Sequence, residues 1–149
     1  MRTFLIITGL IHKKDIAGRI GGYGPYVREM NLWIKYFDKV LIVAPMVERE
    51  FCNIDLPYSH DIINIIKIPA FNLTTAGNII KTILLTPYIC LIISDSIIKS
   101  DHIHIRCPNN TGLLGCVIQI FFPKKKKTAK YASNWDWSIK QPWSYRLQQ

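Results

Sequence analysis

The chain has 149 residues, of which 49% are apolar, and a formal net charge of +9. This length suits one domain with a hydrophobic core, and the apolar content excludes a chain that is disordered over most of its length. The four cysteines include no Cys-x-x-Cys pair, which favours reduced intracellular thiols over a disulfide framework. We therefore expect a single intracellular domain over residues 1–149.

Two segments bear on membranes, and neither indicates export or a bilayer span. The apolar run near the N-terminus, residues 4–7, is shorter than the core of a signal peptide. Residues 79–93 are very apolar, but Lys81 and Pro87 interrupt them, which favours a buried or interfacial helix over a transmembrane one. We expect a cytoplasmic protein with possible peripheral contact at the inner face of the membrane.

The positive charge is concentrated in the second part of the chain. Residues 102–149 hold eight Lys or Arg against one Asp, and much of the excess is the lysine run 124–127. Such a run is most often a solvated strand entrance, although it would also attract phosphates or anionic lipid headgroups. Nucleic acid is disfavoured, because no aromatic residue stands between these lysines.

The first element is a strand, and a glycine-rich stretch follows it. Residues 3–8 form a continuous apolar run, typical of a strand buried on both faces of a parallel sheet. Residues 17–26, Ala-Gly-Arg-Ile-Gly-Gly-Tyr-Gly-Pro-Tyr, then predict a loop whose amides meet an anionic ligand at the start of a helix. The loop matches neither the dinucleotide fingerprint nor the P-loop, and a plain connector that caps the helix is the alternative.

Strands and helices then alternate along the chain. The predicted elements are a helix over 25–36, a strand over 40–44, an irregular loop over 46–61, a strand over 62–68, a helix from 74 or 75 to 85 that Pro87 kinks or restarts toward 99, a strand over 102–106, a helix over 113–122, a strand over 126–132, and a helix start at 144–149. This order predicts an α/β, Rossmann-like parallel sheet of about five strands with helices on both faces.

Three loops are then expected at the carboxyl edge of the sheet: residues 9–24, 106–111 and 133–143. Arg106, at the end of its strand and beside a helix start, is placed to hold a phosphate or a sugar hydroxyl. The alternative is that it caps a helix or pairs with Asp136. Asp136 could orient a substrate hydroxyl or act as a base, but no second carboxylate accompanies it.

Histidines and aromatic residues complete the candidates. His102 and His104 alternate with isoleucines and so share one face of a strand, but two histidines without a third ligand predict no metal site. A structural role is favoured for both. Trp135, Trp137 and Trp143 suit a sugar-stacking platform or, as the simpler explanation, packing against another domain.

Four segments together resemble the amino-terminal half of family-4 glycosyltransferases of the GT-B fold. They read Ile-Gly-Gly-Tyr-Gly-Pro-Tyr-Val-Arg-Glu-Met (20–30), Val-Leu-Ile-Val-Ala-Pro (40–45), His-Ile-Arg-Cys-Pro-Asn-Asn (104–110) and Lys-Tyr-Ala-Ser-Asn-Trp-Asp (130–136). The resemblance covers nearly the whole chain. It implies two Rossmann-like domains facing across a cleft, the first binding the acceptor and the second the nucleotide-sugar.

The resemblance also implies a set of donor- or acceptor-binding residues. From the resemblance these are Gly21, Gly22, Tyr23 and Gly24, and with the candidates at the other two loops the predicted set adds Arg106, Asn109, Asn110, Asn134 and Asp136. The glycine loop would lie by the donor diphosphate, and Arg106 stands where family members often have the second histidine of His-x-His. No metal or cofactor is implied, because the nucleotide-sugar is a substrate.

The family's paired-glutamate motif and its basic phosphate ligands belong to the second domain, and none of them is present in these 149 residues. The resemblance therefore implies a partial glycosyltransferase, inactive or nearly so by itself, that acts on a glycan or lipid-linked acceptor with a missing carboxyl-terminal domain as partner. The alternative function is a non-catalytic α/β module that binds phosphorylated ligands or anionic membrane.

Overall fold

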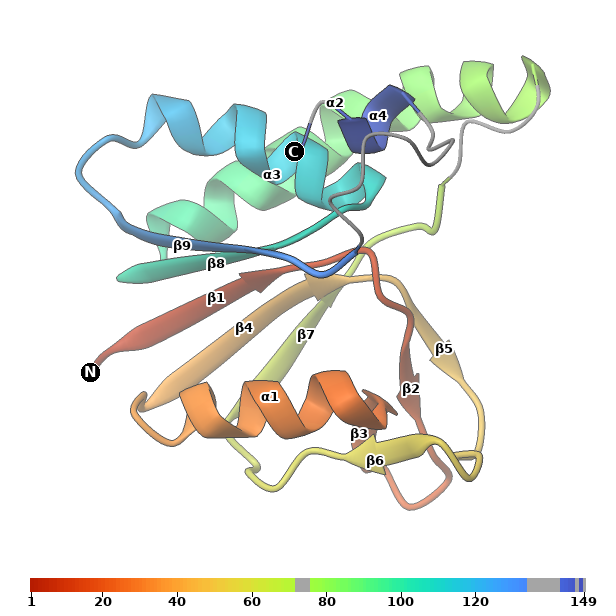
Figure 1. The fold of residues 1–149 in the computed structure, drawn as a ribbon, viewed down its shortest axis with the longest axis vertical. Helices are drawn as coiled ribbons and strands as arrows, with labels where there is room; N and C mark the ends of the chain where they lie inside the picture. Colours follow the sequence, from red (N-terminus) through yellow and green to blue (C-terminus); the bar gives the residue numbers. More distant parts are fainter. Residues whose placement is uncertain (72–75, 134–142, 147, 149) are drawn as a thin grey trace.

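The computed structural model describes residues 1–71, 76–133, 143–146 and 148 (Figure 1). Its centre is a parallel sheet with the strand order β7-β4-β1-β8-β9. The strands are β1 (Thr3–Ile7), β4 (Lys39–Ala44), β7 (Ile63–Lys67), β8 (His102–Cys107) and β9 (Lys126–Tyr131). The predicted α/β class, with a five-stranded Rossmann-like sheet, is confirmed.

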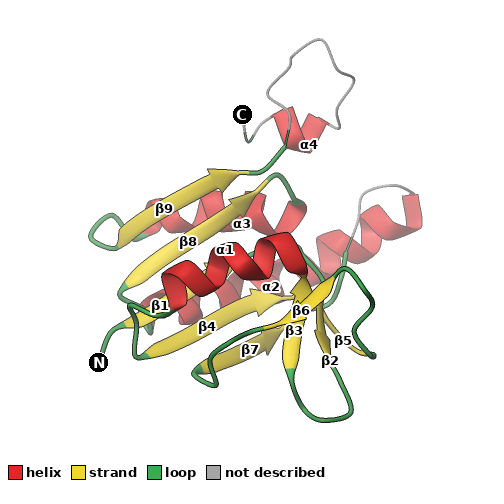
Figure 2. Ribbon diagram, turned by 60° about the horizontal axis from the view of Figure 1, so that its bottom comes forward, coloured by secondary structure: helices red, strands yellow, loops and turns green. Residues whose placement is uncertain are grey.

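Helices cover both faces of this sheet. In Figures 1 and 2, α1 (Gly24–Ile34) lies on one face, and α2 (Ala76–Ile98) lies with α3 (Asn110–Ile118) on the other. The turn η1 (Gln119–Phe121) continues α3, and α4 (Trp143–Arg146) is a single turn. Because successive strand side chains point to opposite faces, Phe4 and Ile6 pack toward α1 while Leu5 and Ile7 pack toward α2 and α3. The alternation thus builds two cores from one strand.

Helix α2 continues through Pro87 as one element, so of the predicted kink or restart the restart is wrong. A proline inside a helix removes one backbone hydrogen bond and costs about 3 kcal/mol. Buried side chains before and after Pro87 offset this cost. Thr82 on its N-terminal side, and Ile89 and Ile93 on its C-terminal side, are all packed inside the fold. Tertiary packing therefore overrides the local signal.

A second, four-stranded sheet occupies the segments that were expected to be irregular. It has the order β5-β2-β3-β6 and consists of β2 (His12–Lys14), β3 (Ile20–Tyr23), β5 (Met46–Glu48) and β6 (Asp55–Pro57). The predicted loops over residues 9–24 and 46–61 are wrong in this respect. Their strands have only three or four residues, too few to show periodicity, and they pair across long separations such as Gly21 with Pro57.

The glycines of the 17–26 stretch serve this second sheet. Gly18 takes a φ of +79° in the turn between β2 and β3, where glycine is favoured. A Cβ on Gly21 would lie 2.2 Å from the carbonyl oxygen of Leu56, so only glycine allows β6 to approach. Residues 20–23 are consequently a strand rather than part of a loop that leads into α1.

Candidate functional site

A crevice opens at the carboxyl edge of the parallel sheet, where the strand order reverses. After β1 the chain builds β4 and β7 on one side of it, and α2 then leads to β8 on the other side. The ends of β1 and β8 therefore diverge at the position where open α/β sheets bind ligands. The hollow measures about 260 Å³, and we call it the carboxyl-edge crevice; its lining residues are Gly9, Ile11, Pro45, Ala70, Phe71, Asn109, Asn110, Thr111 and Tyr145.

Asn109 fixes one wall of the carboxyl-edge crevice by capping α3. Its Oδ1 accepts a hydrogen bond from the Gly112 amide at 2.7 Å, and its Nδ2 donates to the carbonyl oxygen of Arg106. A Cβ on Gly9 would lie 2.6 Å from that Oδ1, so a glycine is needed where β1 ends. The Asn109 side chain is thus committed to the fold.

Asn110 and Thr111 form the first turn of α3 and face the same hollow. The first amides of a helix have no intrahelical partner, and the macrodipole places partial positive charge there. Here Asn109 takes up the amides of Gly112 and Leu113. The helix start and the Asn110 carboxamide can therefore bind hydroxyl or anionic oxygen atoms that enter the crevice.

Arg106 lies on the other side of its strand, in an ion-pair cluster with Glu29 and Lys130. Its Nη1 is 2.9 Å from Oε2 of Glu29, and Lys130 Nζ is 2.7 Å from Oε1. The guanidinium also stacks on the Tyr26 ring, 4.8 Å from its centre. Burial alone would raise the pKa of Glu29, but the hydrogen bonds from Lys130 and Arg106 outweigh it and lower the pKa. The observed partner is Glu29, and Asp136 lies outside the described residues.

A buried polar chain connects this region to the second sheet. His12 donates from Nδ1 to the carbonyl oxygen of Leu10 at 3.0 Å, and its Nε2 accepts from the Tyr58 hydroxyl at 2.9 Å. Burial lowers the pKa of His12 to about 4, and burial raises the pKa values of Tyr26 and Tyr58. All three groups are therefore neutral near pH 7, which suits a rigid support better than proton transfer.

His102 and His104 lie on one face of β8, as the alternation predicts. Both contact the Thr128 hydroxyl, at 3.1 Å from His102 Nε2 and 2.9 Å from His104 Nδ1. Burial lowers the pKa of His104 to about 4, so this ring is neutral near pH 7. Within the part of the chain that the structure describes, no three His, Cys, Asp or Glu side chains gather in a way that could hold a metal ion.

The predicted glycines lie behind the carboxyl-edge crevice, not in it. Gly21, Gly22 and Tyr23 belong to β3, which pairs with β2 on one side and β6 on the other. The amide of Gly24 donates to the carbonyl oxygen of Ile54 at 2.8 Å. Gly22 nevertheless packs against Ile11, one of the lining residues. The structure thus brings Asn109 and Asn110 to the crevice and leaves Arg106 and the glycines outside it; Asn134 and Asp136 lie outside the described residues.

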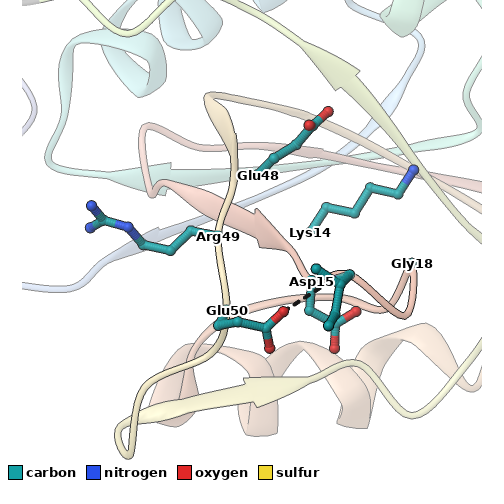
Figure 3. Close-up of a pocket in the computed structure, with 7 residues that line it drawn as sticks. Lys14, Asp15, Gly18, Glu48, Arg49 and Glu50 are labelled. Carbon is teal, nitrogen blue, oxygen red and sulfur yellow. Dashed lines mark hydrogen bonds between the residues drawn. The ribbon is translucent and has the colours of Figure 1, made fainter.

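A larger hollow of about 450 Å³ lies at the outer tip of the second sheet, and it is a poorer candidate. Figure 3 shows Lys14, Glu48 and Arg49 pointing in different directions around it. The Asp15 carboxylate is occupied by Arg19, with Nε and Oδ2 2.7 Å apart, and Glu50 accepts from the Ile16 amide. Its two engaged carboxylates serve the fold, and the other polar side chains do not converge on one point.

Sequence reasoning missed Glu29 and Gly9. Glu29 follows Tyr26 by three residues in α1, so both lie on the helix face toward Arg106, and this spacing was a usable signal. The need for glycine at position 9 depends on a contact with Asn109, a hundred residues away, and no local pattern reveals it. Comparison with known protein families, curated proteins and solved structures gives no match.

Proposed function

We propose that this chain is the acceptor-side half of a GT-B glycosyltransferase similar to family 4, which transfers a sugar from a nucleotide-sugar to a glycan or lipid-linked acceptor. Two observations support the proposal: the four sequence segments that resemble this family, and the five-stranded Rossmann-like sheet of the chain. The observation that carries it is the carboxyl-edge crevice, which lies at the strand reversal and is bounded by the start of α3.

The lining residues suit a sugar. Asn110 offers a carboxamide that can both donate to and accept from hydroxyl groups. Phe71 and Tyr145 add aromatic surface, against which the C–H faces of a pyranose pack. A second Rossmann-like domain would hold the nucleotide-sugar across the cleft.

The reaction would form a bond from the acceptor hydroxyl oxygen to the anomeric carbon of the donor. The bond between that carbon and the diphosphate breaks, the diphosphate leaves with the electron pair, and the hydroxyl proton passes to a base. Because the Gly24 amide is bound to Ile54, we assign stabilisation of negative charge on this half to the first turn of α3 rather than to the glycines.

The test is binding of small glycans to the ¹⁵N-labelled chain, followed by NMR. Methyl glycosides and disaccharides should shift the amide signals of Gly9, Asn110 and Thr111, while UDP-hexoses should shift them only weakly without the second domain and release no UDP. Asn110→Ala should weaken the glycan shifts by roughly tenfold, as expected for loss of one or two hydrogen bonds. Asn53→Ala, at an exposed position in the turn before β6, is the matched control.

Two results would contradict the proposal. Turnover of a nucleotide-sugar by this chain alone at ordinary enzyme rates would show that it is not a half-enzyme. A folded chain whose crevice signals respond to no glycan would remove the acceptor role.

A second candidate is a module that binds phosphorylated ligands at the Glu29–Arg106–Lys130 cluster, where two cations share one carboxylate. Phosphate or a sugar phosphate would then shift the amides of Arg106 and Lys130. Glu29→Gln would strengthen that binding, because it removes the competing carboxylate. Shifts confined to Asn110 and Thr111 would favour the glycosyltransferase instead.

A further inference from the structure

The outer surface of the helical layer formed by α2, α3 and η1 is apolar over most of its length. We call it the apolar helical face and define it by the exposed residues Ile80, Ile83, Leu84, Tyr88, Leu91, Ile98, Val117, Ile120 and Phe121. Leu84 is 75% exposed, Leu91 70% and Phe121 77%. Figure 1 shows α2 and α3 side by side above the sheet, on the opposite side from α1. Large contiguous apolar surface of this kind marks an interaction site.

Helix α2 is apolar on both sides, which is unusual for a helix at the surface of a domain. Its inner side packs Ile89, Ile93 and Ile97 into the core against the sheet. Its outer side, read at positions 80, 84, 87 and 91, carries Ile, Leu, Pro and Leu. Only toward the end of the helix does the row include a charge, Asp95, which is paired with Lys99. In proteins, a helix that is hydrophobic on all sides is generally buried, so its outer side also contacts apolar protein or lipid.

Length and composition also make α2 the one helix in the described part of the chain that could cross a bilayer. Its inner side, however, holds three isoleucines of the core, so crossing the bilayer would dismantle the sheet's cover. A position parallel to the membrane surface keeps this packing and still covers the outer side.

Basic groups stand at one end of the apolar helical face. Lys125 Nζ donates to the carbonyl oxygens of Ile98 and Ser100, and Lys127 Nζ donates to that of Gln119, so the lysine run is fastened to the ends of α2 and η1. Lys124 and Lys127 are exposed there, whereas Lys126 pairs with His102 in the sheet and lies on the side that α1 covers. The sequence has no acidic residue between Asp101 and Asp136.

Two adjoining hollows combine the apolar and the basic character. One, of about 270 Å³, is lined by Phe121, Phe122, Pro123, Lys124 and Lys125. The other, of about 530 Å³, is lined by Arg2, Phe37, Asp101, His102, Lys124, Lys125 and Lys126. Since they share Lys124 and Lys125, a partner here would meet apolar surface and positive charge together.

We propose that the apolar helical face docks on an anionic lipid bilayer, with Ile120 and Phe121 entering the boundary between headgroups and acyl chains and with Lys124 and Lys127 paired to lipid phosphates. Charge complementarity favours this occupant over a second copy of the chain, because dimerisation would bring two chains of charge +9 together. The inference does not depend on the proposed glycosyl transfer, since it uses a different surface and a lipid rather than a sugar probe.

The experiment is co-sedimentation of the purified chain with lipid vesicles. Vesicles of phosphatidylcholine alone are compared with vesicles that contain about one third phosphatidylglycerol, at about 0.1 M and about 1 M salt. We expect binding to the anionic vesicles, roughly tenfold or more weaker binding to the neutral ones, and release at high salt.

Paired variants locate the surface. Lys124→Gln with Lys127→Gln, and separately Ile120→Ser with Phe121→Ser, should each lower the partition coefficient by roughly tenfold or more. The matched controls lie on α1 and just after it: Lys35→Gln with Lys39→Gln, and Leu32→Ser with Tyr36→Ser, where Leu32 is 63% and Tyr36 60% exposed. They should bind as the unmodified chain does, and thermal unfolding by circular dichroism shows that every variant is folded.

Each remaining outcome overturns the proposal. Equal binding to neutral vesicles would remove the role of charge, and equal loss in the control pairs would show non-specific adsorption. Retention on vesicles at about 1 M salt would indicate insertion of α2 rather than surface docking. A lipid-free dimer in analytical ultracentrifugation that Ile120→Ser with Phe121→Ser converts to monomer would assign the face to self-association.

Discussion

Helices cover both faces of the parallel sheet, but the residues that these helices expose to solvent differ between the two faces. On one face, α1 presents Arg28 and Lys35 to solvent and uses Glu29 to connect two strands through Arg106 and Lys130. On the other, α2 presents Ile80, Leu84 and Leu91 and the other residues of the apolar helical face. Both helices bury a core row, so packing alone does not explain the difference. The outer side of α1 mixes charged residues with Leu32, whereas that of α2 is mainly apolar, and this difference is the basis for the docking proposed above.

The largest expected effect comes from breaking the inner side of α2. Ile93→Ala removes a fully buried side chain from the core and should lower the free energy of unfolding by about 2–5 kcal/mol, through lost burial and the cavity left behind. Leu91→Ala, two residues away on the outer side, should change it by less than about 0.5 kcal/mol. Urea unfolding measures both. Equal destabilisation would show that the outer side is also packed in the isolated chain.

Acid should weaken the face that α1 covers. His104 is buried, and its pKa falls from 6.5 to about 4 in the folded state, so the unfolded chain binds the proton more readily between these values. Stability is therefore fully present above pH 6.5 and falls as the pH drops toward 4, by at most about 3 kcal/mol for this residue. His12 has the same shift and adds a similar loss.

His104→Gln provides the control for this titration. The variant should lose the His104 share of the pH dependence and keep that of His12, as measured by urea unfolding across the pH range. A stability that stays constant from pH 6.5 to 4 in the unmodified chain would contradict the assigned burial of both rings.

A smaller effect is expected at the cap of α3. Asn109→Ala removes the acceptor for the Gly112 amide and should cost about 1 kcal/mol of stability. Asn109→Ser retains a capping oxygen and should recover much of that loss. The same two variants distinguish a capping role of Asn109 from direct contact with the glycan. If Asn109 only caps α3, Asn109→Ser should keep the glycan-induced shifts of the Asn110 and Thr111 amides. Full loss of those shifts in Asn109→Ser would mean that the Asn109 side chain itself binds the glycan.

The smallest expected effects separate the ion pairs of the two faces. The side chains of Arg106 and Glu29 are 17% and 21% exposed, whereas those of Lys99 and Asp95 on α2 are 62% and 58% exposed. Double-mutant cycles with Gln or Asn should give a coupling of about 1 kcal/mol for the first pair and at most about 0.5 kcal/mol for the second. Salt should weaken the second coupling more. Equal couplings would show that burial does not strengthen the first pair.

Prediction from the sequence succeeded where one continuous segment carries the signal. The run at residues 3–8 predicted β1, and the alternation at residues 102–106 predicted β8 with its two histidines on one face. It failed for the second sheet. Strands of three residues are too short to show an alternation of apolar and polar residues, and some of them pair with strands more than thirty residues away in the chain.

For the candidate site the division is similar. Asn109 and Asn110 follow a strand end directly, and that position is local information. The sequence also placed Arg106 correctly at the end of its strand. Its partner Glu29, however, lies 77 residues away in the chain, and the direction of a side chain on a strand does not identify the residue that it contacts.

The amino-acid sequence by itself determined the alternation of strands and helices, and with it the parallel sheet, because hydrophobic period and capping residues act over a few neighbouring positions. Only the tertiary structure decided that the glycines allow β6 to approach closely, that Pro87 lies inside a helix, and that the apolar outer side of α2 is exposed. Each of these depends on close contact, or its absence, between segments distant in the chain, and the free energy of such contacts exceeds the local preference.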